Sequence, residues 1–356
     1  MRIAIVNDLA MAVESLRRVV CSSGSHSLAW IARSGIEAVE MCKKDVPDLI
    51  LMDMIMPEMN GVLATRKIMQ QTPCPILIVT SSVTAHAPMV FEAMGAGALD
   101  AVVTPVLSGE TKTASTKTLL NKIDMIGKLK GPGKSLKCKK LKASSEEAPD
   151  IDAIPSMVAI GCSTGGPSAV VKLLKTFPAN FDAAVIVIQH MDEKFVAGLS
   201  NWLSQQSPLP VIMPEDGTVI RPGRVYLPGT SGHVRINGRG ELYYGSDPEE
   251  CFYHPSVDVF FNSIAENFQH QGIGVLLTGM GQDGGSGLLA LRRRGFLTIA
   301  QDQQSSVVYG MPRHAVQLGA AVKILPIEKI GSEIVKRIAT LKEKTRVSVM
   351  ASTTDH

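Results

Sequence analysis

The sequence predicts an α/β protein built from two parallel-sheet domains. Short apolar runs alternate with longer amphipathic stretches over residues 1–105, and the same alternation resumes at residue 157. Strands that alternate with helices favour parallel sheets with right-handed crossovers. A lysine-rich segment with a Gly-Pro-Gly break separates the two patterns, and 356 residues is about twice the length of a typical domain. We therefore expect two domains joined by a linker.

The first domain, expected at residues 1–127, contains four apolar runs short enough to be buried strands. Helical spacing of apolar residues fills the stretches between these runs, and a last amphipathic stretch closes the unit. The expected strands are 3–6, 49–52, 76–79 and 101–103, and the expected helices are 10–21, 35–44, 62–70, 85–96 and 112–127.

Residues 128–152 are typical of an exposed linker, because lysines, a Gly-Pro-Gly break and a Ser/Glu/Pro tract replace the apolar pattern. A plain solvated tether explains this composition. A basic contact strip for an acidic partner surface explains it as well. Both interpretations remain open at this point.

The second domain is expected at residues 153–345, followed by a tail at 346–356. A turn-rich, β-like section at 208–245 predicts hairpins attached to the second sheet. The expected strands are 157–160, 184–188, 275–278 and 298–300, and the expected helices are 167–176, 193–204, 256–270, 285–294 and 327–342.

Composition excludes several classes of function. A formal charge of +3 gives no reason to expect nucleic acid binding. No apolar run reaches the roughly 18 residues of a membrane span, and the start of the chain does not have the pattern of a signal peptide. The six cysteines form no Cys-x-x-Cys pair or zinc spacing, which favours free thiols in a reducing cytoplasm. We expect a cytoplasmic protein that does not insert into membranes.

Polar side chains follow three of the strands expected in the first domain. Asp8 follows the first strand, Asp53 the third and Thr80 the fourth. The carboxyl ends of parallel strands meet at one edge of a sheet, and carboxylates gathered there favour a divalent cation such as Mg²⁺. Helix capping by the two acids is the simpler interpretation of either residue alone.

Asp53 followed by MIMPEMNG, with Thr80 and Pro105 further along, resembles the receiver domain of response regulators. The resemblance implies a flavodoxin-like fold in which Asp53 accepts a phosphoryl group, Asp8 and Asp53 bind Mg²⁺, and Thr80 is the switch hydroxyl. Asn7 and Thr104 depart from it, since receivers generally carry an acid and a lysine there. Loss of the acid should weaken Mg²⁺ binding, and loss of the lysine removes a partner of the phosphate. The alternative is a degenerate receiver that acts as a docking or constitutive inhibitory module.

Ser163 lies in the glycine-rich segment AIGCSTGGP, which is predicted to join a strand to a helix. Such a turn lifts the hydroxyl toward backbone N–H groups at a helix N-terminus, an arrangement that suits a nucleophile whose substrate becomes an oxyanion. The pattern fits G-x-S-x-G. Glycine-rich strand–helix turns also bind phosphates, so a nucleotide- or phosphate-binding protein is a competing hypothesis. The neighbouring Cys162 leaves a reactive thiol as a further alternative.

Two more segments favour catalysis over binding. His190 ends the strand predicted after Ser163, and Asp283 lies in the glycine-rich turn LTGMGQDG after a later strand. A histidine that accepts the serine proton and is held by a carboxylate completes the logic of a catalytic triad. A lipase-like hydrolase would order its triad Ser, acid, His, whereas the order here is Ser, His, Asp. His233, His254 and His314 are interpreted as structural or substrate-side residues.

The motifs GCSTGGP, QHM and LTGMGQDG, with PSVDVFF, AQD and VVYGMP, resemble the catalytic domain of chemotaxis receptor methylesterases, the CheB family. The resemblance implies that Ser163 is the nucleophile, His190 the general base and Asp283 its orienting partner. It also implies that the N–H of Met280 contributes to the oxyanion hole and that Thr164 adjoins the nucleophile.

The implied reaction is hydrolysis of glutamyl methyl esters on methylated chemoreceptors, together with glutamine deamidation as a second activity of the family. It needs no cofactor for catalysis. A chemotaxis histidine kinase is the implied source of the phosphoryl group on Asp53, and the receiver is expected to cover the serine cleft until it is phosphorylated.

Overall fold

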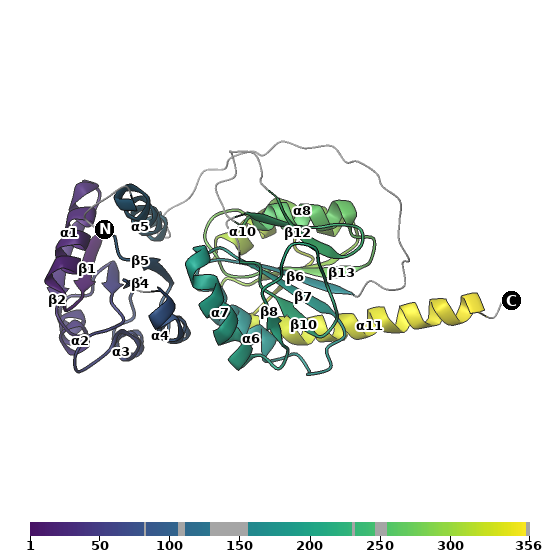
Figure 1. Ribbon diagram of the computed structural model, residues 1–356, viewed down its shortest axis with the longest axis horizontal. Coiled ribbons are helices and arrows are strands. Elements are labelled where there is room, and N and C mark those ends of the chain that lie inside the picture. Colours follow the sequence, from purple (N-terminus) through teal and green to yellow (C-terminus); the bar gives the residue numbers. More distant parts are fainter. Residues whose placement is uncertain (82, 106–110, 129–155, 230–231, 246–254, 354–356) are drawn as a thin grey trace. The chain divides into compact units, whose positions relative to one another are not determined.

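The computed structural model describes residues 1–81, 83–105, 111–128, 156–229, 232–245 and 255–353. The chain divides into two compact units, Met1–Lys139 and Lys140–His356. Both are shown in Figure 1. The linker expected at 128–152 lies, apart from its first residue, outside the described residues. The boundary between the units falls inside that expected segment.

The first unit is a five-stranded parallel sheet with the strand order β2-β1-β3-β4-β5. This order is that of the flavodoxin-like doubly wound fold, as the sequence predicts. The strands are β1 (Arg2–Val6), β2 (Ser27–Ala32), β3 (Leu49–Met52), β4 (Ile76–Thr80) and β5 (Asp100–Val103), and the helices are α1 (Ala10–Ser22), α2 (Gly35–Lys44), α3 (Gly61–Gln71), α4 (Val83–Gly95) and α5 (Thr111–Lys128).

Strand β2 is the element of this unit that the expected set of strands does not include. It lies at the edge of the sheet, and Trp30 and Ala32 are its only fully buried residues. The central strand β3, in contrast, is buried along its whole length. The strand does carry an apolar run, Leu28 to Ala32, so the sequence contained a signal for it that the expected set of strands left out.

The second unit is built on a seven-stranded sheet with the order β15-β14-β13-β6-β7-β10-β8, in which every pair is parallel. The strands are β6 (Met157–Cys162), β7 (Ala184–Gln189), β8 (Val211–Ile212), β10 (Arg224–Tyr226), β13 (Gly272–Leu276), β14 (Leu297–Gln301) and β15 (Lys323–Leu325). The helices are α6 (Gly166–Leu174), α7 (Glu193–Gln206), α8 (Val257–Asn267), α9 (Gly285–Arg293), α10 (Met311–Gln317) and α11 (Ile327–Thr353).

The section at 208–245 differs in part from the expected set of hairpins. β11 (His233–Ile236) and β12 (Glu241–Gly245) form an antiparallel hairpin, and β9 (Thr218–Val219) joins it in a separate three-stranded sheet. Strands β8 and β10 instead extend the main sheet in parallel register. Burial of Val225 and Tyr226 beside β7 explains the difference, because it gives β10 an apolar contact with the main sheet.

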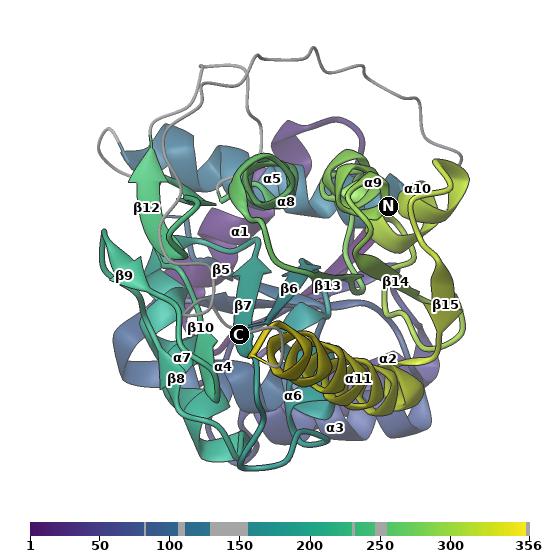
Figure 2. The same ribbon diagram turned by 90° about the vertical axis from the view of Figure 1, so that its right-hand side faces the viewer.

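Helices cover both faces of the second sheet. Figure 2 shows α8, α9 and α10 on one face, with α6 and α11 on the other. The core shared with β6, β7 and β12 buries Phe260 and Phe261 of α8. It also buries Phe268, the residue directly after this helix. Burying each such ring contributes about 1.5–3 kcal/mol, so this core fixes the N-terminus of α8 beside the strand ends. No helix in the described ranges is long and apolar enough to cross a membrane.

Candidate active site

Ser163 occupies a tight turn between β6 and α6. The Gly166 N–H donates to the Ser163 carbonyl over 2.7 Å, and Gly165 has a φ of 76°, which favours glycine. A Cβ on Gly166 would lie 2.2 Å from the side-chain oxygen of Gln189, so the close approach also requires glycine there. The strand–turn–helix predicted around the serine is therefore present. Ser163 is 8% exposed.

His190 follows the adjacent strand at the same level. Strands β6 and β7 pair through Cys162 and Gln189, and the His190 N–H donates to the Cys162 carbonyl over 3.0 Å. Ser163 directly follows Cys162 and His190 directly follows Gln189, so both come immediately after paired residues at the ends of neighbouring strands. The structure brings both to the carboxyl edge of the sheet, where ligands bind in open parallel sheets.

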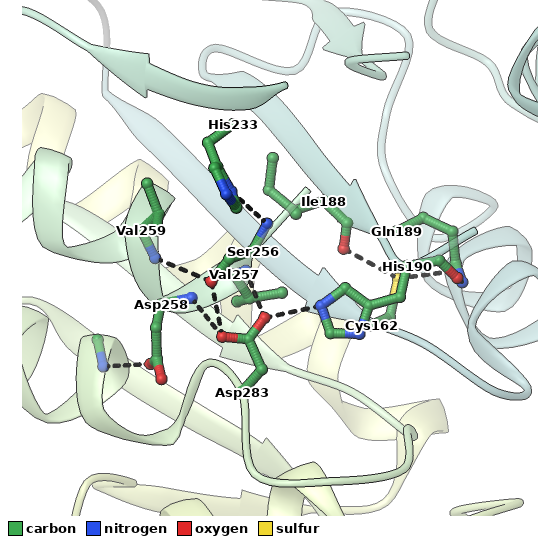
Figure 3. A network of polar contacts seen from close by, with 11 residues as sticks. Cys162, Ile188, Gln189, His190, His233, Ser256, Val257, Asp258, Val259 and Asp283 are labelled. Atoms are coloured by element: carbon green, nitrogen blue, oxygen red, sulfur yellow. Dashed lines mark hydrogen bonds and ion pairs between the residues drawn. The ribbon is translucent and has the colours of Figure 1, made fainter. Parts of the chain in front are cut away.

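Asp283 reaches the same edge from the loop after β13, the other neighbour of β6. His190 Nε2 and Asp283 Oδ2 lie 2.7 Å apart, and both side chains are more than nine-tenths buried. Figure 3 shows the imidazole facing the carboxylate. A carboxylate accepts hydrogen bonds, so Nε2 carries the proton of this pair and Nδ1 is the basic nitrogen of the neutral ring.

Three further donors hold the Asp283 carboxylate, all from the start of α8. Ser256 Oγ and the Asp258 N–H donate to Oδ1 over 2.8 and 3.0 Å, and the Val257 N–H donates to Oδ2 over 2.6 Å. Burial alone would raise the pKa of Asp283. The contact with His190 and the backbone N–H groups outweigh burial and hold that pKa below its ordinary value. Asp283 is therefore ionised at neutral pH.

Asp258 is a second buried carboxyl beside Asp283. Its Oδ1 accepts a 2.6 Å hydrogen bond from the Gly287 N–H of α9. Burial, followed by the negative charge of Asp283, raises the pKa of Asp258 to about 7. Ser256 and Asp258 belong to the PSVDVFF motif. The motif alone gives them no role, since their contact with Asp283 depends on the packing of α8 against α9.

Gln189 connects the backbones of the serine and the histidine. Its Nε2 donates to the Ser163 carbonyl over 2.9 Å and to the His190 carbonyl over 3.0 Å. The Cys162 thiol donates to Gln189 Oε1 over 3.1 Å, which fixes the orientation of the amide. Burial raises the pKa of the Cys162 thiol, so this cysteine is a neutral hydrogen-bond donor and the reactive-thiol alternative loses its support.

The loop 278–281 lies against the other side of Ser163. A Cβ on Gly279 would meet Ser163 Cβ at 2.9 Å, and the Ser163 N–H donates to the Thr278 carbonyl over 3.1 Å. Thr278 Oγ1 donates to the Thr164 carbonyl over 3.0 Å. Thr164 and Met280, both predicted near the nucleophile, are 7% and 8% exposed. The Thr278 and Gly279 N–H groups of this loop donate to Gln301 Oε1 and the Val308 carbonyl, over 2.8 and 3.1 Å.

The remaining predicted histidines contribute less directly. His233 of β11 is buried, and its Nδ1 accepts from the Ser256 N–H over 3.1 Å. His314 of α10 lies against Gly285, and burial lowers its pKa, so it is neutral at pH 7. His254 lies outside the described residues.

The first unit brings its own predicted residues to one edge. Asp8 and Asp53 follow β1 and β3, and Thr80 is the last residue of β4; these three strands are adjacent in the sheet. Burial first, and then the charge of Asp8, raises the pKa of Asp53 to about 6. Asn7 is buried, and its Oδ1 accepts from the Leu9 N–H over 2.8 Å. Two neighbouring carboxylates fit a divalent cation, although a cluster of three or more candidate ligands is not found in the described part of the chain.

Comparisons with known proteins match both units. The CheB methylesterase family model matches residues 158–334, and the response regulator receiver domain model matches residues 3–115. A protein-glutamate methylesterase/protein-glutamine glutaminase 2 of Burkholderia pseudomallei is 46% identical over 346 residues, which are 97% of this chain and 100% of that protein. A protein-glutamate methylesterase/protein-glutamine glutaminase of Mesorhizobium japonicum is 48% identical over 94% of this chain and 98% of its own. The crystal structure of the Thermotoga maritima CheB methylesterase catalytic domain aligns with a TM-score of 0.49 and 34% identity, covering 51% of this chain and 98% of that domain.

Proposed function

The chain belongs to the CheB methylesterase family, and we propose that it hydrolyses glutamyl methyl esters on chemoreceptors. In this proposal Ser163 is the nucleophile, His190 the general base and Asp283 the residue that orients the imidazole. The 2.7 Å contact between His190 and Asp283, at the strand end beside the Ser163 turn, is the observation that carries the proposal.

Acylation follows from this geometry. Ser163 Oγ attacks the side-chain ester carbonyl, and His190 Nδ1 takes its proton. The new charge on the carbonyl oxygen is stabilised by backbone N–H groups of the Ser163 turn and of the loop that contains Met280. The imidazolium, held by ionised Asp283, then protonates the departing methoxide. Methanol leaves and a glutamyl ester of Ser163 remains.

Deacylation repeats the steps with water. His190 takes a proton from water, the hydroxide attacks the acyl carbonyl, and the serine oxygen leaves with the proton of the imidazolium. The product is a receptor glutamate. A glutamine side chain can enter the same sequence with ammonia as the leaving group, which would make deamidation a second activity of this site.

The first unit would regulate the second through Asp53. We expect a chemotaxis histidine kinase to phosphorylate this aspartate, with Thr80 as the switch hydroxyl. Asp8 and Asp53 would hold Mg²⁺, whose charge would offset that of the phosphoryl group. Asn7 supplies no second acid, so we expect weak Mg²⁺ binding. Thr104 supplies no cation for the phosphate.

Methanol release from a methyl-labelled chemoreceptor tests the proposal. The full chain should release methanol, and Ser163→Ala should not. Ser200→Ala is the matched control, since Ser200 is 8% exposed, as Ser163 is, but lies on α7. If the full chain released no methanol under any condition, the proposal would be contradicted and the phosphate-binding alternative would be favoured.

The same assay with Mg²⁺ and a small phosphodonor tests regulation. Stimulation that is lost in Asp53→Asn would support phosphorylation control despite Asn7 and Thr104. Equal rates with and without the phosphodonor would instead favour the degenerate docking module. A chain lacking residues 1–150 should be faster than the full chain if the first unit inhibits the second.

A further inference from the structure

The turn that begins α8 surrounds the Asp283 carboxylate with hydrogen-bond donors. Together with His190 Nε2, residues 256–258 give each carboxylate oxygen two donors: Ser256 Oγ and Asp258 N for Oδ1, and Val257 N and His190 Nε2 for Oδ2. Figure 3 shows the donors of residues 256–258 on one side of the carboxylate and the His190 ring on the other. With both oxygens occupied, the carboxylate is held in one plane, and that plane sets the plane of the imidazole.

Asp258 makes hydrogen bonds both to Asp283 and to the helix that follows Asp283. While the Asp258 N–H holds the Asp283 side chain, the Asp258 side chain accepts from the Gly287 N–H, in the first turn of the helix that follows Asp283. The starts of α8 and α9 are thus joined by two reciprocal carboxylate contacts. Gly287 packs closely here, since a Cβ on it would meet the Asp258 Cα at 3.2 Å.

Ser256 has two roles in the same turn. Its Oγ donates to Asp283 and accepts from the Val259 N–H, so it is also the N-cap of α8. Its own N–H donates to His233 Nδ1. The serine is 1% exposed, so its hydroxyl is held by protein contacts on both sides.

We propose that Ser256 and Asp258 are positioning residues of the esterase, which act through Asp283 on the orientation and basicity of His190. The inference deepens the proposed function and rests on it, because Asp283 matters for catalysis only as part of the triad. Ser256 supplies a neutral donor that offsets the charge of Asp283. Asp258 supplies a hydrogen bond that joins two helices and, where it is ionised above about pH 7, a second negative charge.

The two residues should shift the basicity of His190 in opposite directions. Loss of the Ser256 donor leaves the charge of Asp283 less balanced, which stabilises the imidazolium and raises the pKa of His190. Asp258 has a pKa of about 7 and is ionised only in part near neutral pH, so loss of its charge lowers the pKa of His190 by a smaller amount. Among the described residues, His233 of β11 contacts this turn through the Ser256 N–H, and His314 of α10 lies against Gly285 at the start of α9; both stay the same in these variants.

Three variants of the full chain separate these effects. Ser256→Ala removes the donor, Asp258→Asn removes charge but keeps an oxygen for the Gly287 N–H, and Asp258→Ala removes both. Ser263→Ala is the matched control, because Ser263 is a buried, hydrogen-bonded serine of the same helix that donates to Phe260 instead.

The measurements are the pH profile of kcat/KM for methanol release and the titration of the His190 ring by NMR, which needs no substrate. We expect kcat to fall about tenfold in Ser256→Ala and Asp258→Ala with KM unchanged. The acid limb should move up by about half a pH unit in Ser256→Ala and down by a smaller amount in Asp258→Asn, because Asp258 is largely protonated below pH 7. Ser263→Ala should leave both measurements at the wild-type values.

The outcomes distinguish this inference from the proposed function. Methanol release by the wild type with unshifted pH profiles and NMR titrations in all variants would overturn the positioning role, even if the melting temperature fell. Shifts in the same direction for Ser256→Ala and Asp258→Asn would overturn it as well. Opposite NMR shifts without methanol release by the wild type would support the positioning role and contradict the methylesterase.

Discussion

Gln189→Leu tests whether the amide behind the triad holds the serine and the histidine in register. Leucine has a similar size and keeps the position apolar, but it removes the two donations to the Ser163 and His190 carbonyls and the contact with the Cys162 thiol. The Ser163 carbonyl keeps its hydrogen bond from the Gly166 N–H. The His190 carbonyl loses its donor from Gln189.

The magnitude follows from these contacts. Three hydrogen bonds at about 1 kcal/mol each predict a loss of about 3 kcal/mol in the free energy of unfolding. For a unit of this size, that corresponds to a fall of roughly 6–12 °C in the melting temperature. A shift of about 1 Å between nucleophile and base would lower kcat about a hundredfold.

Thermal unfolding and methanol release by the same preparation measure both effects. Gln205→Leu is the control, because Gln205 lies on the exposed side of α7. A melting temperature within about 2 °C of the wild type, together with a kcat within about threefold, would refute the reasoning.

Four other changes test separate parts of the account. Asp283→Asn should lower kcat by roughly 10⁴-fold with a folded enzyme, since an amide cannot hold His190 Nε2–H as the carboxylate does; kcat within tenfold of the wild type would contradict the triad. Gly279→Ala should lower kcat, because the new Cβ would lie 2.9 Å from Ser163 Cβ as well as 2.3 Å from Met311 Sδ; an unchanged kcat would show that the loop can move away. Asp258 has a pKa raised to about 7, so its contribution to stability is present below pH 4 and is lost as pH rises through 7. Between pH 5 and 8 the free energy of unfolding in urea should therefore fall less in Asp258→Asn than in the wild type. An equal fall of this free energy in both proteins would refute the prediction. Removal of Mg²⁺ by EDTA should abolish phosphodonor stimulation while leaving basal methanol release unchanged, and a fall in basal release would place a metal in the catalytic step.

Much of the fold could be predicted from the sequence because both sheets are parallel and buried on two faces. Strands such as β3 and β6 are apolar throughout, so they stand out from the amphipathic helices beside them. Elements without such a run were missed. β15 is only partly covered at the edge of its sheet, and α10 is a helix of 7 residues. Neither leaves a strong periodic signal.

Some residues of the candidate site could likewise be predicted from the sequence, and others could not. Ser163, His190 and Asp283 could be placed at one edge because each follows a strand and carries a chemically distinctive side chain. Ser256 and Asp258 could not be assigned a role, since their contact with Asp283 requires the start of α8 to pack against the loop after β13. Strand periodicity carries no information on which helix start meets which loop.

Identification of the acyl-enzyme tests the central claim most directly. A methylated chemoreceptor peptide is mixed with the full chain, the reaction is stopped in acid within the first turnover, and the protein is digested for mass spectrometry. The account predicts a receptor glutamyl group joined to Ser163 Oγ, which is absent from Ser163→Ala and disappears as methanol release reaches completion. Methanol release with an unmodified Ser163, or with the acyl group on another residue, would contradict the nucleophile on which the whole account depends.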